Sequence, residues 1–243
     1  MIPHHTNVHS ESSYERFWTQ HDFSTHNPAF ERLIEITQDR GSMEKDEVGE
    51  NVYIGGLGSS VQAALACGMK VGFVGGTDNH RAQPSEPRSP LGGLDPDEVT
   101  VGGMTAVYAP ELTREAVYSA LHARRCYATQ GQRTLLQFAL GGWGMGSVVP
   151  RDAAMQLGET RSLSYSAIGH RAIMRVEVVR CDGQTFDVTP SAAPTLGLLT
   201  GEFDDTQALP EIDPSVDAVW YYPRVTEIDG RMAWSSPIWL MVG

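Results

Sequence analysis

Two Asp-Gly dipeptides constrain the C-terminal half of this chain more than any other feature of its sequence. Asp182-Gly183 and Asp229-Gly230 each lie between segments rich in β-branched and aromatic residues, and Asp-Gly in that setting indicates a β-hairpin. Short strands joined by hairpin turns predict a small β-sandwich over residues 136–243. Five segments of this half have the composition of strands and no helical period: residues 134–140, 163–168, 172–180, 218–227 and 237–242.

Residues 1–135 follow a different pattern, in which strand-like and helical segments alternate. Ser59 or Ser60 can cap the first predicted helix and Thr113 the second. Strands and helices that alternate at this spacing predict a parallel sheet or a barrel. A long loop is expected over residues 82–103, and the acidic segment 190–217 has no assignment. The predicted strands are residues 33–36, 71–74 and 104–108, and the predicted helices are residues 59–67 and 113–125.

The balance of charge limits the partners that this chain can have. Its 243 residues carry 30 acidic and 18 basic side chains, a net charge of −12 that is spread over both halves. Because there is no basic stripe, we do not expect binding to double-stranded nucleic acid. Three widely spaced cysteines exclude a disulfide scaffold and a zinc ribbon. No apolar run is long enough to cross a bilayer, and the lack of a signal peptide favours the cytoplasm unless the chain continues upstream of Met1.

Histidines are crowded near the start of the chain, where six of the eight fall within the first 80 residues. Asp78 and His80 follow the predicted strand 71–74, at a strand end of the kind where α/β enzymes place catalytic groups. Their carboxylate and imidazole groups suit Zn, Mn or Fe, although such a pair is also typical of a turn aspartate beside an exposed histidine. His4 and His5 follow an apolar pair in a similar position. Neighbours on a strand point to opposite faces, so we expect His5 to face the metal.

Two further groups of side chains have alternative interpretations. Glu35 lies inside a predicted strand, either as an edge residue that points to solvent or as a metal ligand or general base. The aromatic residues of the C-terminal half are predicted to pack in the core rather than to form a platform for sugars. These aromatic residues are Trp220, Tyr221, Tyr222, Trp234 and Trp239.

Several linked motifs resemble one known family. Residues 71–80 read VGFVGGTDNH, residues 102–108 read GGMTAVY and residues 111–131 read ELTREAVYSALHARRCYATQG. In this order they resemble the PHP superfamily, and within it a large bacterial branch known only as a domain of unknown function. Further similarity to that branch lies at residues 2–5, 35–44 and 224–239.

The resemblance implies a distorted (β/α)7 barrel with two or three metal ions at the carboxyl ends of its strands. The final Asp-x-His motif of the family falls on Asp78 and His80, and the preceding histidine motif falls on His4 and His5. The family's early motifs have no counterpart here. We therefore expect residues 1–135 to be the C-terminal half of such a barrel, followed by the β-sandwich, and the chain alone to be weakly active or inactive.

The implied activity is that of a metal-dependent phosphoesterase or related hydrolase, in which a metal-activated water attacks a small phosphorylated or other anionic substrate. Glu35 and Arg81 are the candidate catalytic side chains, and Arg133 is a second candidate for pairing with a phosphate group. Either arginine is also typical of a surface position. Glu44 is a candidate for contacting the site from its loop. The alternative is a non-catalytic protein whose β-sandwich binds a glycan or a protein partner.

Overall fold

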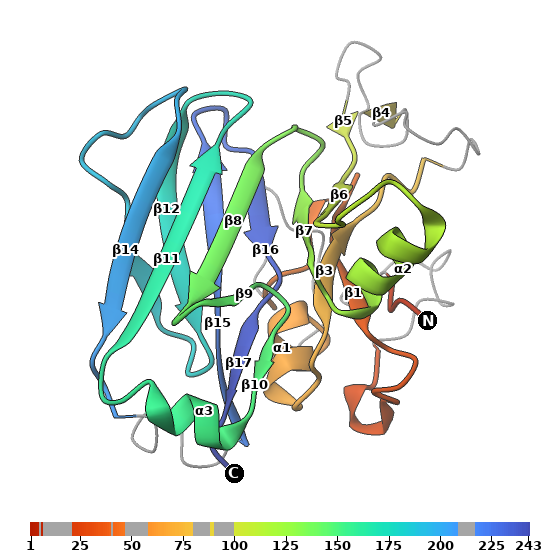
Figure 1. The fold of residues 1–243 in the computed structure, drawn as a ribbon. Helices are drawn as coiled ribbons and strands as arrows, with labels where there is room; N and C mark the ends of the chain where they lie inside the picture. The colour runs from red at the N-terminus through yellow and green to blue at the C-terminus, as the bar shows by residue number, and fades with distance from the viewer. Residues whose placement is uncertain are drawn as a thin grey trace.

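The structure is a computed structural model, and it describes residues 1–4, 6, 21–39, 41–46, 58–79, 88–89, 100–208 and 217–243. In these residues strands far outnumber helices (Figure 1). None of the helices combines the length and the apolar character that crossing a membrane requires. The helical elements are the 3-10 helix η1 (Phe23–Thr25), α1 (Val61–Ala66), α2 (Arg114–His122) and α3 (Arg151–Gln156).

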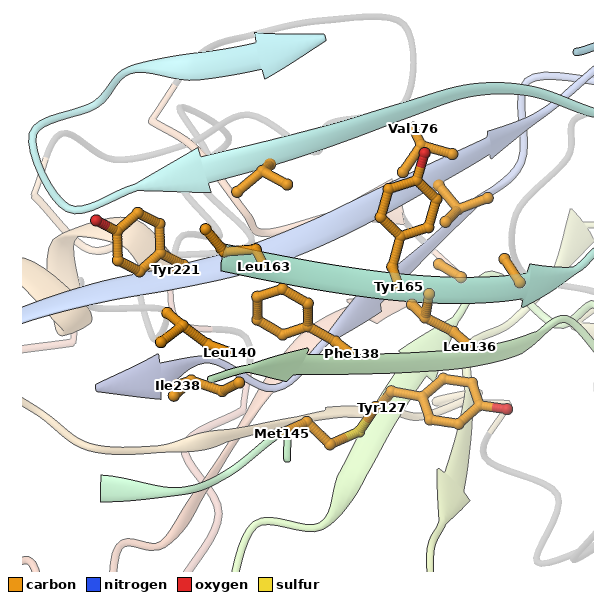
Figure 2. Packing of buried hydrophobic residues seen from close by; sticks show 14 of the residues in the cluster. Tyr127, Leu136, Phe138, Leu140, Met145, Leu163, Tyr165, Val176, Tyr221 and Ile238 are labelled. Carbon is orange, nitrogen blue, oxygen red and sulfur yellow. The ribbon is translucent and has the colours of Figure 1, made fainter. Parts of the chain in front are cut away.

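Two layers of strands face each other in the C-terminal half. One is an antiparallel sheet with the order β14 (Leu199–Asp205), β11 (Arg161–Ile168), β8 (Leu135–Leu140) and β9 (Trp143–Gly144). Buried and exposed side chains alternate along β11, so that one face of this sheet packs in the core and the other faces solvent. Figure 2 shows the core between the layers, which includes Leu136, Phe138, Leu163, Tyr165, Val176, Tyr221 and Ile238.

The other layer is a large sheet that extends into the N-terminal half. Its path has the order β10 (Val148–Val149), β17 (Ile238–Met241), β15 (Ala218–Glu227), β16 (Met232–Ser235), β7 (Cys126–Thr129) and β6 (Met104–Val107). On one side of this path β12 (Ile173–Arg180) pairs with β15 and with β13 (Thr185–Asp187). Because β7 pairs with β16, the sheet crosses the predicted boundary between residues 135 and 136. The division into two domains stays a prediction.

Most of the local predictions for the C-terminal half are confirmed. Both Asp-Gly hairpins form, one between β12 and β13 and one between β15 and β16. Gly183 and Gly230 both have a φ of 82°, which glycine adopts without steric cost. The five aromatic residues predicted to pack in the core are all buried. The unassigned segment 190–217 contains β14, and residues 209–216 lie outside the described residues.

A small sheet holds the first strands of the chain, with the order β2 (Gly41–Ser42), β1 (Leu33–Gln38) and β3 (Gly72–Gly75). β1 and β3 are parallel and are joined through α1, whereas β2 is antiparallel to β1. Ser60 caps α1 and Thr113 caps α2, each by accepting a hydrogen bond from a backbone N–H in the first turn. Most of the predicted loop 82–103 lies outside the described residues. The part of the loop that is described includes two short antiparallel strands, β4 (Arg88–Ser89) and β5 (Thr100–Val101).

The predicted partial (β/α)7 barrel is wrong. The described residues are mostly β, and no closed barrel forms among them. The physical reason lies in the connection through α2. The strands on either side of this helix, β6 and β7, pair in antiparallel fashion and join the large sheet, instead of continuing the parallel arrangement of β1 and β3. A strand, a helix and a second strand have the same local sequence pattern whether the two strands are parallel, as in a barrel, or antiparallel, as here.

Hydroxyl groups attach β3 to the large sheet. The backbone N–H of Phe73 donates to Ser236 Oγ at 2.9 Å. Thr105 Oγ1 accepts a hydrogen bond from the N–H of Gly75 at 3.0 Å and donates one to the carbonyl of the same residue at 2.9 Å. Gly72 lies so close to its neighbours that an added Cβ would be 2.8 Å from Arg124 Cβ.

Replacing Gly72 with alanine is therefore expected to lower the free energy of unfolding by about 1–3 kcal/mol, because the new methyl group must displace the backbone around Arg124. Urea denaturation measures this change. The matched control is Gly144→Ala, since a Cβ added at Gly144 would have no atom within 4 Å. Equal losses for both variants would contradict the close approach of Gly72 to Arg124 and Ser236.

Candidate functional site

The parallel strands β1 and β3 bring predicted site residues from distant parts of the sequence together. Glu35, in β1, is buried, with 9% of its side chain exposed. Its backbone N–H donates to the carbonyl of Pro3 at 3.1 Å, which places the first residues of the chain alongside β1. His4 consequently reaches Glu35, and its Nδ1 atom lies 2.7 Å from Glu35 Oε2.

The contact between His4 and Glu35 determines the chemistry of the imidazole ring. An ionised carboxylate only accepts hydrogen bonds, so a neutral His4 carries its proton on Nδ1 and its lone pair on Nε2. The side chain of His4 is 48% exposed, so the ring lies between a buried acid and solvent. Carboxylates orient metal-binding and catalytic histidines through the same contact.

The loop after β3 leads from this pair to a third candidate. Gly76 packs directly against Glu35, because an added Cβ would be 2.6 Å from Glu35 Oε1. Two residues later Asp78 has a φ of 47°, a left-handed conformation that is uncommon for residues other than glycine. Its Oδ2 atom accepts a hydrogen bond from Gln38 Nε2 at 3.3 Å. Unusual backbone conformations of this kind cluster at functional sites.

The predicted site residues are thus partly assembled. The structure brings His4 and Glu35 into contact and places Asp78 after the adjacent strand. Arg133 is exposed in the connection between β7 and β8. No group of three or more metal-ligating side chains converges within the described part of the chain. Three predicted site residues lie outside that part: His5, His80 and Arg81.

Glu44 belongs to a buried network rather than to a contact with this pair. Its carboxylate accepts hydrogen bonds from Tyr222 Oη at 2.7 Å, Arg224 Nη1 at 3.0 Å and Trp234 Nε1 at 2.9 Å. Burial raises the pKa of Tyr222 well above its ordinary value, and the charge of Glu44 adds to this effect. Burial alone would lower the pKa of Arg224, but Glu44 and Glu177 outweigh it and raise that pKa. These contacts join the segment after β2 to the large sheet.

Two residues near the site were missed in the sequence, and only the first of them carries a usable signal. Gly76 follows Gly75 at the end of a buried strand, and glycine in that position indicates that another group approaches the backbone closely. Gln38 ends β1 and contacts Asp78, but a glutamine at a strand end is too common to single out. Only the second is beyond sequence reasoning.

Comparison with known proteins finds relatives of undefined function. Residues 88–162 match the model of a family described as a protein of unknown function, DUF3604. An uncharacterized protein of Chlamydia pneumoniae is 34% identical over 231 residues, which cover 90% of this chain and 36% of that protein. An uncharacterized protein of Chlamydia trachomatis serovar D is 31% identical over 234 residues, which again cover 90% of this chain and 36% of that protein. No solved structure matches the chain.

These findings correct the predicted family. The PHP superfamily is not supported, because the matching family model is DUF3604 and the relatives are uncharacterized chlamydial proteins. The expectation of bacterial relatives and of a domain of unknown function is confirmed. The chain spans about a third of the length of the curated relatives it matches. Along 90% of its length, the chain is therefore similar to one part of larger chlamydial proteins. Its residues 88–162 match DUF3604.

Proposed function

We propose that the region around β1 and β3 is part of a metal-dependent hydrolytic site, with a phosphoester as substrate and a metal-activated water as nucleophile. The observation that carries this proposal is the contact between the buried Glu35 and His4, 2.7 Å apart, beside the loop that leads to Asp78. Because the chain matches only part of its longer relatives, the activity of a complete protein is also part of the proposal.

The residues of the site have donor types that fit a divalent ion. An imidazole nitrogen from His4 and a carboxylate oxygen from Asp78 suit Zn, Mn or Fe. Glu35 holds the proton of His4 on Nδ1, which makes Nε2 the donor atom. A bound ion would lower the pKa of its water toward neutrality and so supply a hydroxide. Because neighbouring residues of a strand point to opposite faces, only one of His4 and His5 is assigned to the ion, and the contact with Glu35 favours His4 over the predicted His5. His80 is the further predicted ligand, and Arg81 is assigned to pair with the phosphate group.

Replacing Glu35 with glutamine is expected to weaken the binding of Zn²⁺ or Mn²⁺ by about 10–100-fold, because the charged acceptor that orients His4 is lost. Asp78→Asn is expected to weaken binding at least as much, because it removes a ligand rather than a residue that orients one. Equilibrium dialysis of the chain against each ion measures both effects. Hydrolysis of p-nitrophenyl phosphate is the second readout.

The matched control is His170→Gln, which removes an exposed histidine between β11 and β12 and should leave metal binding unchanged. If the unmodified chain bound neither ion more tightly than the Glu35→Gln and Asp78→Asn variants do, the metal site would be ruled out. If the ions bound as expected but the aryl phosphate were not hydrolysed faster than without protein, the phosphoester would be ruled out as substrate of this chain.

A further inference from the structure

A groove of about 380 Å³ lies on the outer face of the four-stranded sheet and shares no lining residue with the site around β1 and β3. Strands β8 and β11, which lie side by side in Figure 1, form its floor. Tyr108 and Arg125, which flank α2, form one wall, and Gly144 in β9 lies at another edge. The volume falls within the range of about 300–1,000 Å³ that small-molecule sites occupy.

The floor of the groove is low, and its lining combines a larger apolar part, which includes Phe138, Met145 and Tyr165, with a few hydroxyl and amide groups. Ser164 pairs with Ala139 across the two strands, and Ser166 pairs with Gln137. Ser166 Oγ donates to Gln137 Oε1 at 3.2 Å, and Tyr108 Oη donates to a backbone carbonyl of β8 at 2.8 Å. Small side chains leave room above the strands, and hydroxyl and amide groups at this spacing suit a ligand with several hydroxyl groups.

Arg125 gives the groove a positive charge. Its side chain is exposed, and its carbonyl accepts a hydrogen bond from the backbone N–H of Tyr108 at 2.9 Å, which holds the two residues next to each other. Among the described residues no carboxylate forms an ion pair with Arg125. A guanidinium group in this position can bind a ligand carboxylate through two parallel hydrogen bonds.

A carboxylate beside the groove disfavours a second negative group on the ligand. Glu202 in β14 pairs with Ser164 and is exposed on the same outer face of the sheet. A ligand with a second negative charge would meet this carboxylate, in a chain whose net charge is already −12. Neutral hydroxyl groups, in contrast, can form hydrogen bonds with Ser164 and Gln137 at the floor. The half-buried ring of Tyr108 offers an apolar surface beside these groups.

From this arrangement we infer that the groove binds a sugar with one carboxylate group, a uronic acid. The carboxylate pairs with Arg125, the hydroxyl groups contact Ser164 and Gln137, and the ring packs beside Tyr108. The inference does not depend on the proposed hydrolytic site, since the two share no residue. It assigns a ligand class to the outer face of the four-stranded sheet, which is separate from the buried aromatic residues of the core.

The test is a titration of the chain with D-glucuronate, followed by NMR, with glucose and glucose 6-phosphate as comparison ligands. We expect saturable binding of glucuronate, and binding about tenfold weaker for Arg125→Gln because a charge-assisted pair is lost. Gly144→Leu should abolish binding, because a Cβ at Gly144 points into open space and the longer side chain would fill the groove. Arg151→Gln, which removes an exposed arginine of α3 outside the groove, should leave binding unchanged.

Each outcome supports or overturns the inference. Saturable binding that is stronger for glucuronate than for glucose, weakened by Arg125→Gln and lost in Gly144→Leu, supports it. Equal binding of glucose and glucuronate would exclude the role of Arg125, and tighter binding of glucose 6-phosphate would replace the uronic acid with a phosphorylated sugar. If the unmodified chain showed no saturable binding of glucuronate at millimolar concentrations, the groove would not be a sugar site.

Discussion

Replacing Glu44 with alanine is expected to lower the free energy of unfolding by about 3–5 kcal/mol, because Tyr222 and Trp234 lose a buried acceptor and Arg224 keeps only one of its two carboxylate partners, Glu177. Glu44 is 4% exposed, and the three side chains that donate to it are buried with it. Alanine removes the shared acceptor of a phenol, a guanidinium and an indole at once. Urea denaturation of the variant and the unmodified chain gives the difference.

The matched control for this prediction is Glu159→Ala, which removes an exposed carboxylate that follows α3 and should change stability by less than about 0.5 kcal/mol. Glu44→Gln is a second comparison, because the amide keeps the size of the side chain and one acceptor oxygen but loses the charge. The loss of unfolding free energy in Glu44→Gln should lie between the losses in Glu44→Ala and Glu159→Ala. A loss for Glu44→Ala as small as that for Glu159→Ala would show that the network does not hold the fold together.

Much of the local structure could be predicted because it depends on neighbouring residues. The turn at Asp229-Gly230 needs only a glycine at positive φ between two strands, and the start of α2 needs only a side-chain acceptor at Thr113. Strand β14 was missed because its acidic residues are typical of a loop. In the structure Glu202 and Asp204 are exposed, whereas Leu199 packs in the core and Asp205 is buried and forms ion pairs with two arginines.

The arrangement of the strands could not be predicted, because it depends on contacts between distant residues. β7 pairs with β16, more than 100 positions later in the chain, and β3 is held by Ser236. Neither contact leaves a periodic pattern in the sequence. A strand followed by a helix and another strand therefore suggested a barrel, whereas these long-range pairs place β6 and β7 in an antiparallel sheet.

The candidate site was predictable by residue type but not by role. A glutamate inside an apolar strand and histidines at a strand end indicate chemistry, and the structure brings Glu35 and His4 together. Glu44 has the same residue type, yet its partners Tyr222 and Arg224 lie 178 and 180 positions away. Only the three-dimensional contacts distinguish an acid that orients an imidazole from an acid that joins two sheets.

Replacing Asp205 with asparagine is expected to cost about 3–5 kcal/mol of stability at neutral pH, because two buried arginines lose the carboxylate they share. Asp205 Oδ2 lies 2.8 Å from Arg180 Nη1 and accepts a hydrogen bond from Tyr221 Oη at 2.7 Å, and Asp205 Oδ1 lies 3.2 Å from Arg161 Nη2. Arg180 keeps Asp182 at 2.7 Å, whereas Arg161 keeps only neutral partners among the described residues. Asp204→Asn, at the exposed neighbouring position, is the matched control.

The effect of Asp205→Asn should also depend on pH. Burial alone would raise the pKa of Asp205, but the hydrogen bonds from Tyr221 and Arg180 outweigh it, so the pKa is below its ordinary value. An unfolded aspartate, with a pKa of about 3.9, then binds more protons than the folded one as the pH falls. The stability that Asp205 contributes is therefore complete above that pH and is lost as the pH falls through the folded pKa. Urea denaturation at a series of pH values should show the gap between the unmodified chain and Asp205→Asn narrowing below about pH 4, and a gap that stays constant there would contradict the charged role of Asp205.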